Sequence, residues 1–403
     1  MVRCKPIVYN TDTMGQQWVE LLKTYDSLEA EMIKDLLESG GIPVIIRSAK
    51  VTPYPVNIGR MGEVKILVQE GNRDRAEAAM KCPDDLSRAS AAIDVGSNTI
   101  RLLIGGIRKN RLNRIYSGRI TTRLAEGIVN SGRLKTVNIG KSLSAIREFY
   151  SLISGCGIKN IRAVGTSAVR EAENSREFLE AVYNETGIKV ERITGIEEAR
   201  LTARGLLSGI NKPSTSLLII DIGGGSTEWI IQTGSLSKGR LLSDSLPAGV
   251  VKLFERFIRT DPPAPDELAA INNEIDSIIA GNEFRTLTHQ SGWMLIGTGG
   301  TITTLASIDL GLDEYDGEKV HMHVIPLEKL LILRDMLIAL PFERRKEIKG
   351  LEPGRADLII PGILLTIRVM ETLGFREIAV SDYGLLEGIL LESCSATGET
   401  TDE

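Results

Sequence analysis

Apolar residues recur along the chain at the two spacings that distinguish helices from strands. Within residues 27–39 they recur every three or four positions, Ser27 is suited to cap the start of a helix, and Gly40 follows its end. Short apolar runs bounded by turn residues predict nearby strands at 19–25, 44–47 and 64–68. Together these segments predict a small α+β unit over residues 6–80.

A longer series of strands and helices then occurs twice. Alternating elements are typical of layered α/β domains, and repetition of the series suggests a duplicated fold with a cleft between its halves. The first half is predicted to contain a hairpin at 102–107 and 112–120, helices at 136–154, 175–186 and 196–208, and strands at 161–165 and 190–193. The second half is predicted to contain strands at 217–220 and 293–296. The predicted division is a small unit at 6–80, a linker at 81–90, lobes at 91–211 and 212–393, and a disordered tail at 394–403.

Each predicted lobe has a glycine-rich turn directly after its first apolar strand. The turns are Asp94-Val95-Gly96-Ser97-Asn98-Thr99 and Asp221-Ile222-Gly223-Gly224-Gly225-Ser226-Thr227-Glu228. Glycine lets successive backbone N–H groups approach one anion, and the Ser and Thr hydroxyls add donors. One such turn could be purely structural, but two matched turns that each begin with Asp predict loops that grip neighbouring phosphates. The candidate phosphate-binding residues are Gly96, Ser97, Asn98, Thr99, Gly223, Gly224, Gly225, Ser226 and Thr227.

Acidic residues beside these turns are candidates for metal binding and for catalysis. Asp94 and Asp221 stand at strand ends, where they could hold a divalent cation directly or through water. Glu171 lies near a strand-to-helix transition, where a carboxylate could activate a water molecule. A solvated glutamate at a helix start explains Glu171 equally well from composition alone. A third loop containing Gly299 and Gly300 could pack against a nucleotide or the distal part of a phosphate chain.

The stretch 101–123 is basic and contains no Asp or Glu. Its basic residues are Arg101, Arg108, Lys109, Arg111, Arg114, Arg119 and Arg123. Such a stretch produces a local positive field that suits a polyanion. For most of these residues we favour a solvated hairpin face. We expect Arg123 to clamp phosphate, because a guanidinium can bind phosphate through two parallel hydrogen bonds.

Composition and charge exclude several functional classes. The hydrophobic fraction of 42% and charged fraction of 25% are those of an ordinary globular protein, whereas the net charge of −5 argues against a nucleic-acid binder. The four cysteines are far apart and form no CxxC pair, which argues against zinc or disulfides and favours a reducing cytoplasm. We find no signal peptide and no apolar run long enough for a membrane span, so we expect a cytoplasmic enzyme without membrane contact.

Six motifs in chain order resemble those of the exopolyphosphatase and guanosine pentaphosphate phosphohydrolase family, which has the duplicated actin-like (ribonuclease H-like) ATPase fold. They lie at 94–104, 122–127, 165–172, 194–201, 221–228 and 297–301, and the resemblance covers about 90–393. It implies an acidic catalytic base at Glu171. It also implies a divalent metal, usually Mg²⁺ with Mn²⁺ as an alternative, near Asp221 and Glu228. Phosphate binding is assigned to the two loops with Arg123, and Glu197 and Glu198 match an acidic motif of the same cleft.

The chain departs from this family in two places. Family members often carry Arg where the last motif here has Leu386, which affects any contact of that helix with the cleft. The chain also stops near residue 403, without the long C-terminal helical domain of larger members, which could favour shorter phosphate chains. Residues 6–80 are similar to a small signal-transducing domain of ferredoxin-like or PII-like α+β pattern, for which a regulatory role and a passive packing role both stay open.

The leading hypothesis is metal-dependent hydrolysis of the terminal phosphate of inorganic polyphosphate by a homodimer, with water activated by Glu171. Guanosine pentaphosphate is the alternative substrate. A small-molecule kinase of the same fold is a competing reading, against which the acid in Ala-Val-Arg-Glu-Ala counts. A non-catalytic sensor of polyphosphate or alarmone, with residues 6–80 as its output, is the other competitor.

Overall fold

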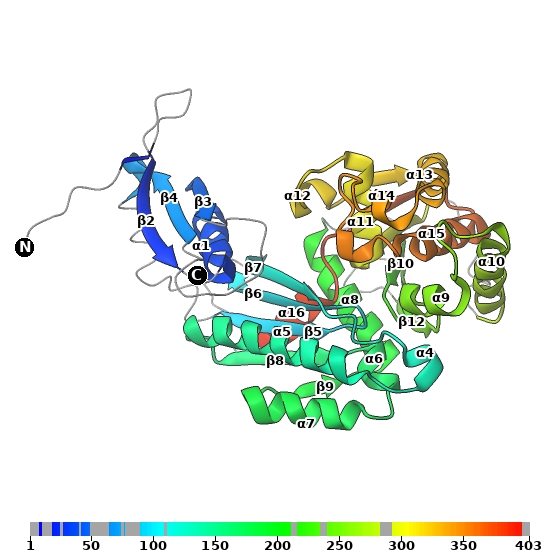
Figure 1. Ribbon diagram of the computed structural model, residues 1–403, viewed down its shortest axis with the longest axis horizontal. Helices are drawn as coiled ribbons and strands as arrows, with labels where there is room; N and C mark the ends of the chain where they lie inside the picture. Colours follow the sequence, from blue (N-terminus) through cyan, green and yellow to red (C-terminus); the bar gives the residue numbers. More distant parts are fainter. Residues whose placement is uncertain are drawn as a thin grey trace, which may run out of the picture.

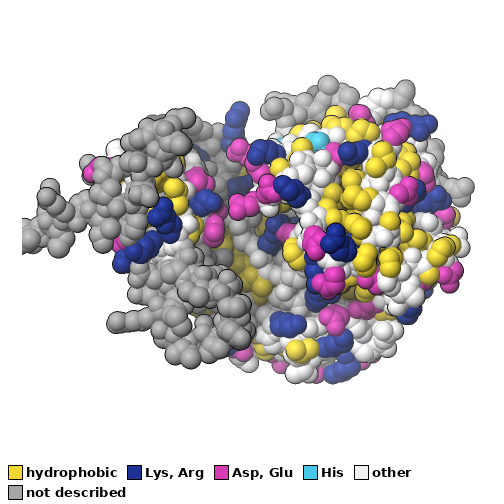
Figure 2. Space-filling model, turned by 45° about the horizontal axis from the view of Figure 1, so that its top comes forward, with side chains coloured by type: hydrophobic (Ala, Val, Ile, Leu, Met, Phe, Trp, Pro, Cys, Tyr) yellow, Lys and Arg dark blue, Asp and Glu magenta, His cyan; other side chains and the backbone are white. Residues whose placement is uncertain are grey.

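The computed structural model arranges the chain as a small N-terminal unit beside two larger lobes (Figure 1). It describes residues 8–9, 18–24, 27–39, 42–48, 64–73, 76, 89–108, 111–210, 216–233, 240–282 and 292–396. Among the helices of these residues, none is both long enough and apolar enough to cross a membrane. On the face drawn in Figure 2, basic and acidic side chains are interspersed, and hydrophobic side chains gather over the second lobe.

The N-terminal unit is a four-stranded antiparallel sheet with one helix packed on it. Its elements are β1 (Val8–Tyr9), β2 (Trp18–Thr24), α1 (Ser27–Ser39), β3 (Val44–Ser48), β4 (Val64–Gln69) and the short 3₁₀ helix η1 (Glu70–Asn72). The strand order β1-β2-β4-β3 agrees with the predicted ferredoxin-like pattern. Val19, Leu37 and Ile66 are fully buried between helix and sheet. Helix α1 also contacts β7, an edge strand of the first lobe. Most of the predicted linker, 81–88, lies outside the described residues.

The first lobe is built on a five-stranded sheet of order β7-β6-β5-β8-β9. Its strands are β5 (Ser90–Val95), β6 (Thr99–Arg108), β7 (Arg111–Thr121), β8 (Asn160–Gly165) and β9 (Val190–Arg192). The pairs β5–β6 and β6–β7 are antiparallel, whereas β5–β8 and β8–β9 are parallel. The helices of this part are α4 (Ile128–Ser131), α5 (Thr136–Gly155), α6 (Ser167–Glu171), α7 (Ser175–Thr186) and α8 (Gly195–Gly209).

The second lobe repeats this arrangement and adds one strand. Its sheet has the order β12-β11-β10-β13-β15-β14, and again two antiparallel pairs precede two parallel ones. The strands are β10 (Leu217–Ile222), β11 (Thr227–Thr233), β12 (Arg240–Leu246), β13 (Met294–Thr298), β14 (Val324–Pro326) and β15 (Glu377–Val380). The other elements are α9 (Val250–Phe257), α10 (Pro265–Ala280), α11 (Gly299–Leu310), α12 (Gly317–Val320), α13 (Leu327–Ala339), α14 (Phe342–Arg345), η3 (Pro353–Arg355) and α15 (Ile359–Leu373). The matching strand order confirms the predicted duplicated fold.

The last helix, α16 (Leu385–Ala396), returns to the first lobe. It packs on α8, β5 and β6, and Ile389 and Leu390 are fully buried there with Leu201. The division of the chain at 211 and 212 placed this helix in the second lobe, because the apolar pattern shows that it is buried but not against which sheet. The helix also includes 394–396 of the predicted tail, and 397–403 lie outside the described residues.

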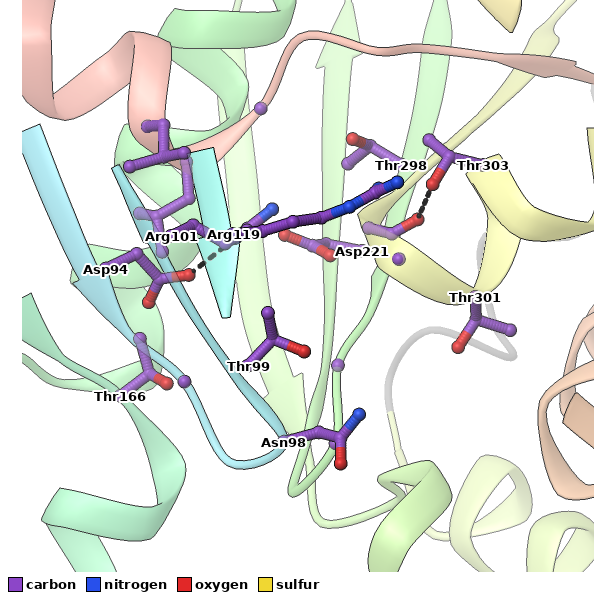
Figure 3. A pocket seen from close by; sticks show the side chains of 18 of the residues that line it. Asp94, Asn98, Thr99, Arg101, Arg119, Thr166, Asp221, Thr298, Thr301 and Thr303 are labelled. Carbon is purple, nitrogen blue, oxygen red and sulfur yellow. Dashed lines mark hydrogen bonds and ion pairs between the residues drawn. The ribbon is translucent and has the colours of Figure 1, made fainter. Parts of the chain in front are cut away.

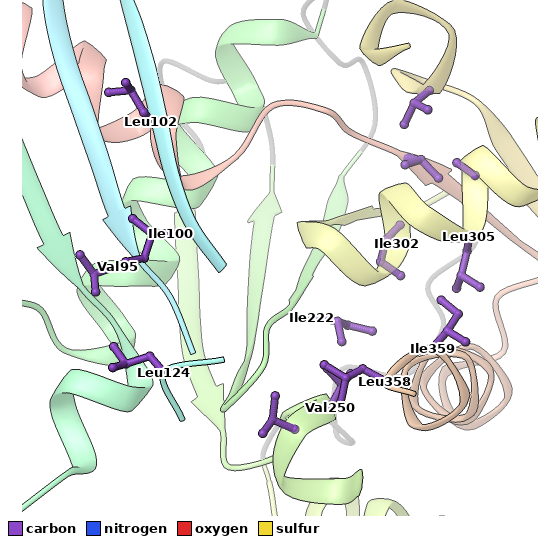
Figure 4. Packing of buried hydrophobic residues seen from close by; sticks show 14 of the residues in the cluster. Val95, Ile100, Leu102, Leu124, Ile222, Val250, Ile302, Leu305, Leu358 and Ile359 are labelled. Atoms are coloured by element: carbon purple, nitrogen blue, oxygen red, sulfur yellow. The ribbon is translucent and has the colours of Figure 1, made fainter. Parts of the chain in front are cut away.

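A hydrophobic core stands behind each of the two glycine loops. Val95, Ile100 and Leu124 pack behind the first loop, and Ile222 and Val250 pack beside the second (Figure 4). All five side chains are at most 3% exposed. This packing holds the strand ends on which the two loops sit.

Candidate phosphate-binding cleft

The two glycine loops lie at the ends of β5 and β10 and meet between the lobes. Each turn is closed by a backbone bond, from the N–H of Gly96 to the carbonyl of Thr99 at 3.2 Å and from the N–H of Gly223 to the carbonyl of Ser226 at 3.0 Å. A Cβ at Gly225 would lie 2.7 Å from the Cβ of Ser167 and 2.9 Å from the Oγ of Ser97. Only glycine allows so close an approach, which explains the glycine at position 225.

A single cleft between the lobes brings most of the predicted site residues together (Figure 3). Its wall includes both loops, the third loop with Gly299 and Gly300, and the side chains of Asp94, Asp221 and Glu198. Gly299 has φ +87°, and a Cβ there would overlap Asp221. The cleft also contains groups that sequence reasoning did not assign, namely Arg101, Arg114, Arg119, Arg355, Thr166, Ser167, Thr298, Thr301, Thr303, Tyr315, Asp382 and Glu387.

Three buried carboxylates, from Asp94, Asp221 and Glu198, line the cleft, and a fourth, Glu228, is buried opposite Asp221 without being among the described residues that line it. Asp221 and Glu228 are directly opposite each other on β10 and β11, and Ser245 donates a hydrogen bond to Glu228 at 2.7 Å. Burial raises the pKa of Asp221, against the charge of Arg101. Burial raises the pKa of Glu228 to about 7, and the charge of Asp221 adds to the shift. Carboxylates crowded in this way favour a bound cation or a retained proton.

Asp94 and Glu198 complete this acidic group. Asp94 accepts hydrogen bonds from Arg101 on one oxygen, with Nε at 2.8 Å, while its other oxygen is buried and has no hydrogen-bond partner among the described residues. Glu198, on α8, is 7% exposed and accepts from Arg170 at 3.1 Å. Burial raises the pKa of Glu198 well above its usual value, the charge of Glu228 raises it further, and Arg170 opposes the shift.

Glu171 lies at the rim of the cleft, at the end of α6. Its side chain is 38% exposed and pairs with Lys252 of α9, whose Nζ lies 2.7 Å from Oε2. Ser167, which does line the cleft, donates a hydrogen bond to Glu171 at 2.6 Å. Glu171 itself is not among the described residues that line the cleft. Its carboxylate therefore links the two lobes through Lys252, whereas Glu198 faces the interior.

Arg101, Arg114 and Arg119 of the hairpin β6–β7 line the cleft, which differs from the solvated face favoured by the sequence, whereas Arg108 and Arg111 are exposed as predicted. Arg101 is the cross-strand partner of both Asp94 on β5 and Arg119 on β7, so the three side chains share one face of the sheet. Burial lowers the pKa of Arg101, but the charges of Asp94 and Asp221 outweigh burial and raise it overall. The two-residue alternation of side chains along the hairpin could have placed Arg101 and Arg119 on one face. The strand register is needed to show that this face meets the cleft.

Arg114 reaches the same face because of a β-bulge. The pairing of β6 with β7 slips between Ile104 and Gly105, so that Gly105 pairs with Arg114 while Ile104 pairs with Tyr116. The extra residue reverses the alternation and directs Arg114 to the cleft side. There it pairs with Asp382 at 2.8 Å and Glu387 at 3.2 Å, and its guanidinium stacks on Tyr383. Leu386, next to Glu387, is 6% exposed and contributes an apolar side chain to the cleft wall.

Arg123 occupies a different position from the phosphate clamp that the sequence suggested. It has a left-handed backbone with φ 54°, and its guanidinium forms two bonds to Asp357 of the second lobe, at 2.6 and 3.1 Å. It lines a second cavity, on whose wall Ser97 and Asn98 also lie. In the described structure Arg123 thus ties the lobes together behind the first loop.

Among the described residues, no three His, Cys, Asp or Glu side chains are grouped so that they could hold a metal ion by themselves. The cleft nevertheless fits a cation that is shared with a ligand. Mg²⁺ is commonly bound by one or two carboxylates together with phosphate oxygens and water. The buried oxygen of Asp94 without a partner and the raised pKa values of Asp221 and Glu228 mark the place where a positive charge would be most stabilised.

A duplicated actin-like fold that presents glycine loops, arginines and buried acids to one cleft defines a class of enzymes acting on phosphate groups. The chain belongs to the Ppx/GppA phosphatase family, whose model matches residues 103–396. This membership confirms the resemblance and the enzyme class predicted from the sequence, a phosphoanhydride hydrolase. Residues 18–82 match a second family model, described as "Putative prokaryotic signal transducing protein".

Three relatives align with this chain over nearly their whole length. Exopolyphosphatase 2 of Mycobacterium tuberculosis is 29% identical over 314 residues, which is 75% of this chain and 97% of the relative. The crystal structure of the Aquifex aeolicus Ppx/GppA family member is 31% identical with a TM-score of 0.64, and covers 78% of this chain and 99% of its own. An exopolyphosphatase structure from Cytophaga hutchinsonii is 29% identical with a TM-score of 0.69, and covers 76% and 98%.

Proposed function

We propose that the enzyme hydrolyses the terminal phosphate of inorganic polyphosphate in the cleft between its lobes. The observation that carries this proposal is the number of guanidiniums facing the cleft, from Arg101, Arg114, Arg119 and Arg355, beside two loops of backbone donors. A chain of anionic phosphates needs this kind of lining and little else. Relatives of the chain are named exopolyphosphatases, which agrees with this substrate.

The cleft wall favours polyphosphate over guanosine pentaphosphate, because it has few groups that would hold a guanine ring. A guanine is usually held by stacking on an aromatic face and by hydrogen bonds to its edges. Tyr315 is the one aromatic residue among the described residues of the cleft wall. Its hydroxyl bonds to Asp382, and the guanidinium of Arg119 covers its ring at 4.7 Å. One face of this ring is therefore already occupied.

For the group that activates water we favour Glu198 over Glu171. A general base must reach the proton that it removes, and it works best when its pKa lies near the working pH. Glu198 lines the cleft and has a raised pKa, whereas Glu171 is held at the rim by Lys252. Arg170 holds the carboxylate of Glu198 and lies near Ser226 of the second loop, so one side chain aligns the base with the phosphate loop.

The two glycine loops would bind the attacked phosphate, and the acidic residues would hold a metal ion. Backbone N–H groups of the two loops would stabilise charge on the oxygens of the attacked phosphoryl group. Asp94 and Asp221, which line the cleft, would hold Mg²⁺ or Mn²⁺ together with the substrate, and the negative charge of Glu228 opposite Asp221 would stabilise the bound cation. A bound divalent ion would neutralise negative charge on the phosphate. The homodimer and the cytoplasmic location stay predictions.

The direct test measures phosphate release from long polyphosphate, tripolyphosphate and guanosine pentaphosphate, each with Mg²⁺ and with Mn²⁺. We expect the highest kcat/KM with polyphosphate and no requirement for an acceptor molecule. A higher kcat/KM with guanosine pentaphosphate would transfer the proposal to the alarmone. Binding of polyphosphate without phosphate release would favour the sensor, and strict dependence on an acceptor would favour a kinase.

A further inference from the structure

Two arginines from opposite lobes meet in the cleft through one shared carboxylate. Arg119 comes from β7 of the first lobe, and Arg355 ends the short helix η3 of the second. Glu352, which precedes η3, accepts a hydrogen bond from Nε of Arg355 at 2.9 Å and forms an ion pair with Nη2 of Arg119. Both arginines line the cleft, and Glu352 is not among the described residues that do. The carboxylate therefore holds the two guanidiniums from outside the cleft wall.

Both guanidiniums line the cleft, and each is held by a further contact besides Glu352. Arg355 uses Nε for Glu352, while its Nη2 lies 3.5 Å from the Thr99 hydroxyl of the first loop. A Cβ on Gly300 would overlap this guanidinium, so the third loop also holds it in place. Arg119 is stacked on Tyr315, and Figure 3 shows its side chain extending from the first lobe towards Thr298 and Thr303 of the second.

The group formed by Arg119, Arg355 and Glu352 carries more positive than negative charge. Burial lowers the pKa of Arg355, Glu352 opposes this, and the positive charges of Arg119 and Arg101 lower it further. Arg114 is matched by two acids and Arg101 by Asp94, whereas Arg119 and Arg355 share the single carboxylate of Glu352. An additional anion placed between the two arginines would reduce their repulsion.

We propose that Glu352 is a positioning residue that joins Arg119 and Arg355 into one anion subsite, which binds a second phosphate of the substrate next to the phosphate held by the glycine loops. This inference rests on the proposed function. Paired guanidiniums suit phosphate because each offers a planar fork of donors. Since each lobe supplies one arginine, the subsite is complete only when the lobes are together. The substrate class that it selects carries at least two neighbouring phosphates, and a phosphomonoester would fill the loops alone.

The test compares Arg119→Gln and Glu352→Gln with Glu343→Gln, which removes an exposed carboxylate of the same lobe that pairs with Lys346. Affinity for tripolyphosphate is measured by calorimetry in a chelator, and kcat and KM are measured with Mg²⁺. We expect Arg119→Gln and Glu352→Gln to raise Kd and KM roughly tenfold or more and to leave kcat within about twofold. The Glu343→Gln protein should match the wild type. Urea unfolding checks that each variant is folded, and the partly exposed Arg119 tests the subsite if Glu352→Gln does not fold.

Two further results separate the possible outcomes. The double variant should bind tripolyphosphate no more weakly than the weaker single variant, because both changes disable one subsite. Multiplied losses, unchanged binding or tighter binding by Glu352→Gln would overturn the positioning role. Hydrolysis of a phosphomonoester should be insensitive to both changes, and an equal loss there would also overturn it. If tripolyphosphate binds as expected but no phosphate is released, the proposed hydrolysis fails while the subsite stands.

Discussion

At the residue scale, a main feature of the cleft is a group of four carboxylates buried in and beside it. Asp94, Asp221, Glu198 and Glu228 are each at most 7% exposed, and the pKa values of the last three are raised by burial and by the charges of neighbouring carboxylates. Such a group is costly in the free protein, because removing ionised carboxylates from water is unfavourable. A bound cation, whose positive charge compensates the carboxylates, would recover part of this cost.

The buried Glu228 makes the stability of the metal-free protein depend on pH. Its pKa is raised from 4.5 to about 7, so the native state keeps a proton that the unfolded state releases between these values. The free energy of unfolding should therefore fall as pH rises through this range, by a few kcal/mol at most. Urea unfolding in a chelator at a series of pH values measures this slope. We expect Glu228→Gln to flatten it and the exposed Glu343→Gln to leave it unchanged; an unaltered slope in Glu228→Gln would contradict the assignment.

The sequence predicted the loop residues of the site better than its charged residues. The glycine loops could be predicted because their chemistry lies in consecutive residues. The sequence could not show whether Glu171 or Glu198 is the better candidate for activating water. That choice depends on Lys252, which approaches Glu171 from the other lobe, and on the burial of Glu198. Arg101, Arg114 and Arg119 were assigned to solvent because a one-dimensional pattern does not show what faces a sheet.

At the element scale, most helices and strands follow from local signals, and the exceptions depend on pairing. Helices α1 and α7 begin and end where the sequence predicted, since polar residues start them and glycines follow. The β-bulge between Ile104 and Gly105 was not predicted, because it is a property of two strands in register. The partner of α16 was likewise missed, because it is set by close contact with α8.

The contact of α16 with α8 should be intolerant of added volume. A Cβ on Gly388 would lie 2.6 Å from the carbonyl carbon of Leu201, inside any normal contact distance. We expect Gly388→Ala to destabilise the protein by about 1–3 kcal/mol through overpacking. Gly140→Ala is the matched control, because Gly140 lies in helix α5 with nothing within 4 Å of its added Cβ, and should stabilise by about 0.5–1 kcal/mol. Chemical denaturation measures both; a neutral Gly388→Ala would show that the two helices can separate at little cost.

At the scale of the whole molecule, the site is made where two similar lobes meet. Contacts that join the lobes around the cleft include Glu171 with Lys252, Arg123 with Asp357, and Glu352 between Arg119 and Arg355. The pairs Glu171–Lys252, Arg123–Asp357 and Glu352–Arg119 join residues far apart in the chain, so none of these three could be predicted from spacing. The duplication itself was predictable because both halves carry the same strand, turn and acid in the same order.

The most direct test of the account compares Glu198→Gln with Glu171→Gln in phosphate release from polyphosphate. If Glu198 activates the water, its loss should lower kcat by about 10²–10⁴-fold, with little change in KM. Loss of Glu171 should cost less than about tenfold, since it removes one rim ion pair with Lys252. The reverse order, a severe loss in Glu171→Gln with nearly normal kcat in Glu198→Gln, would contradict the account.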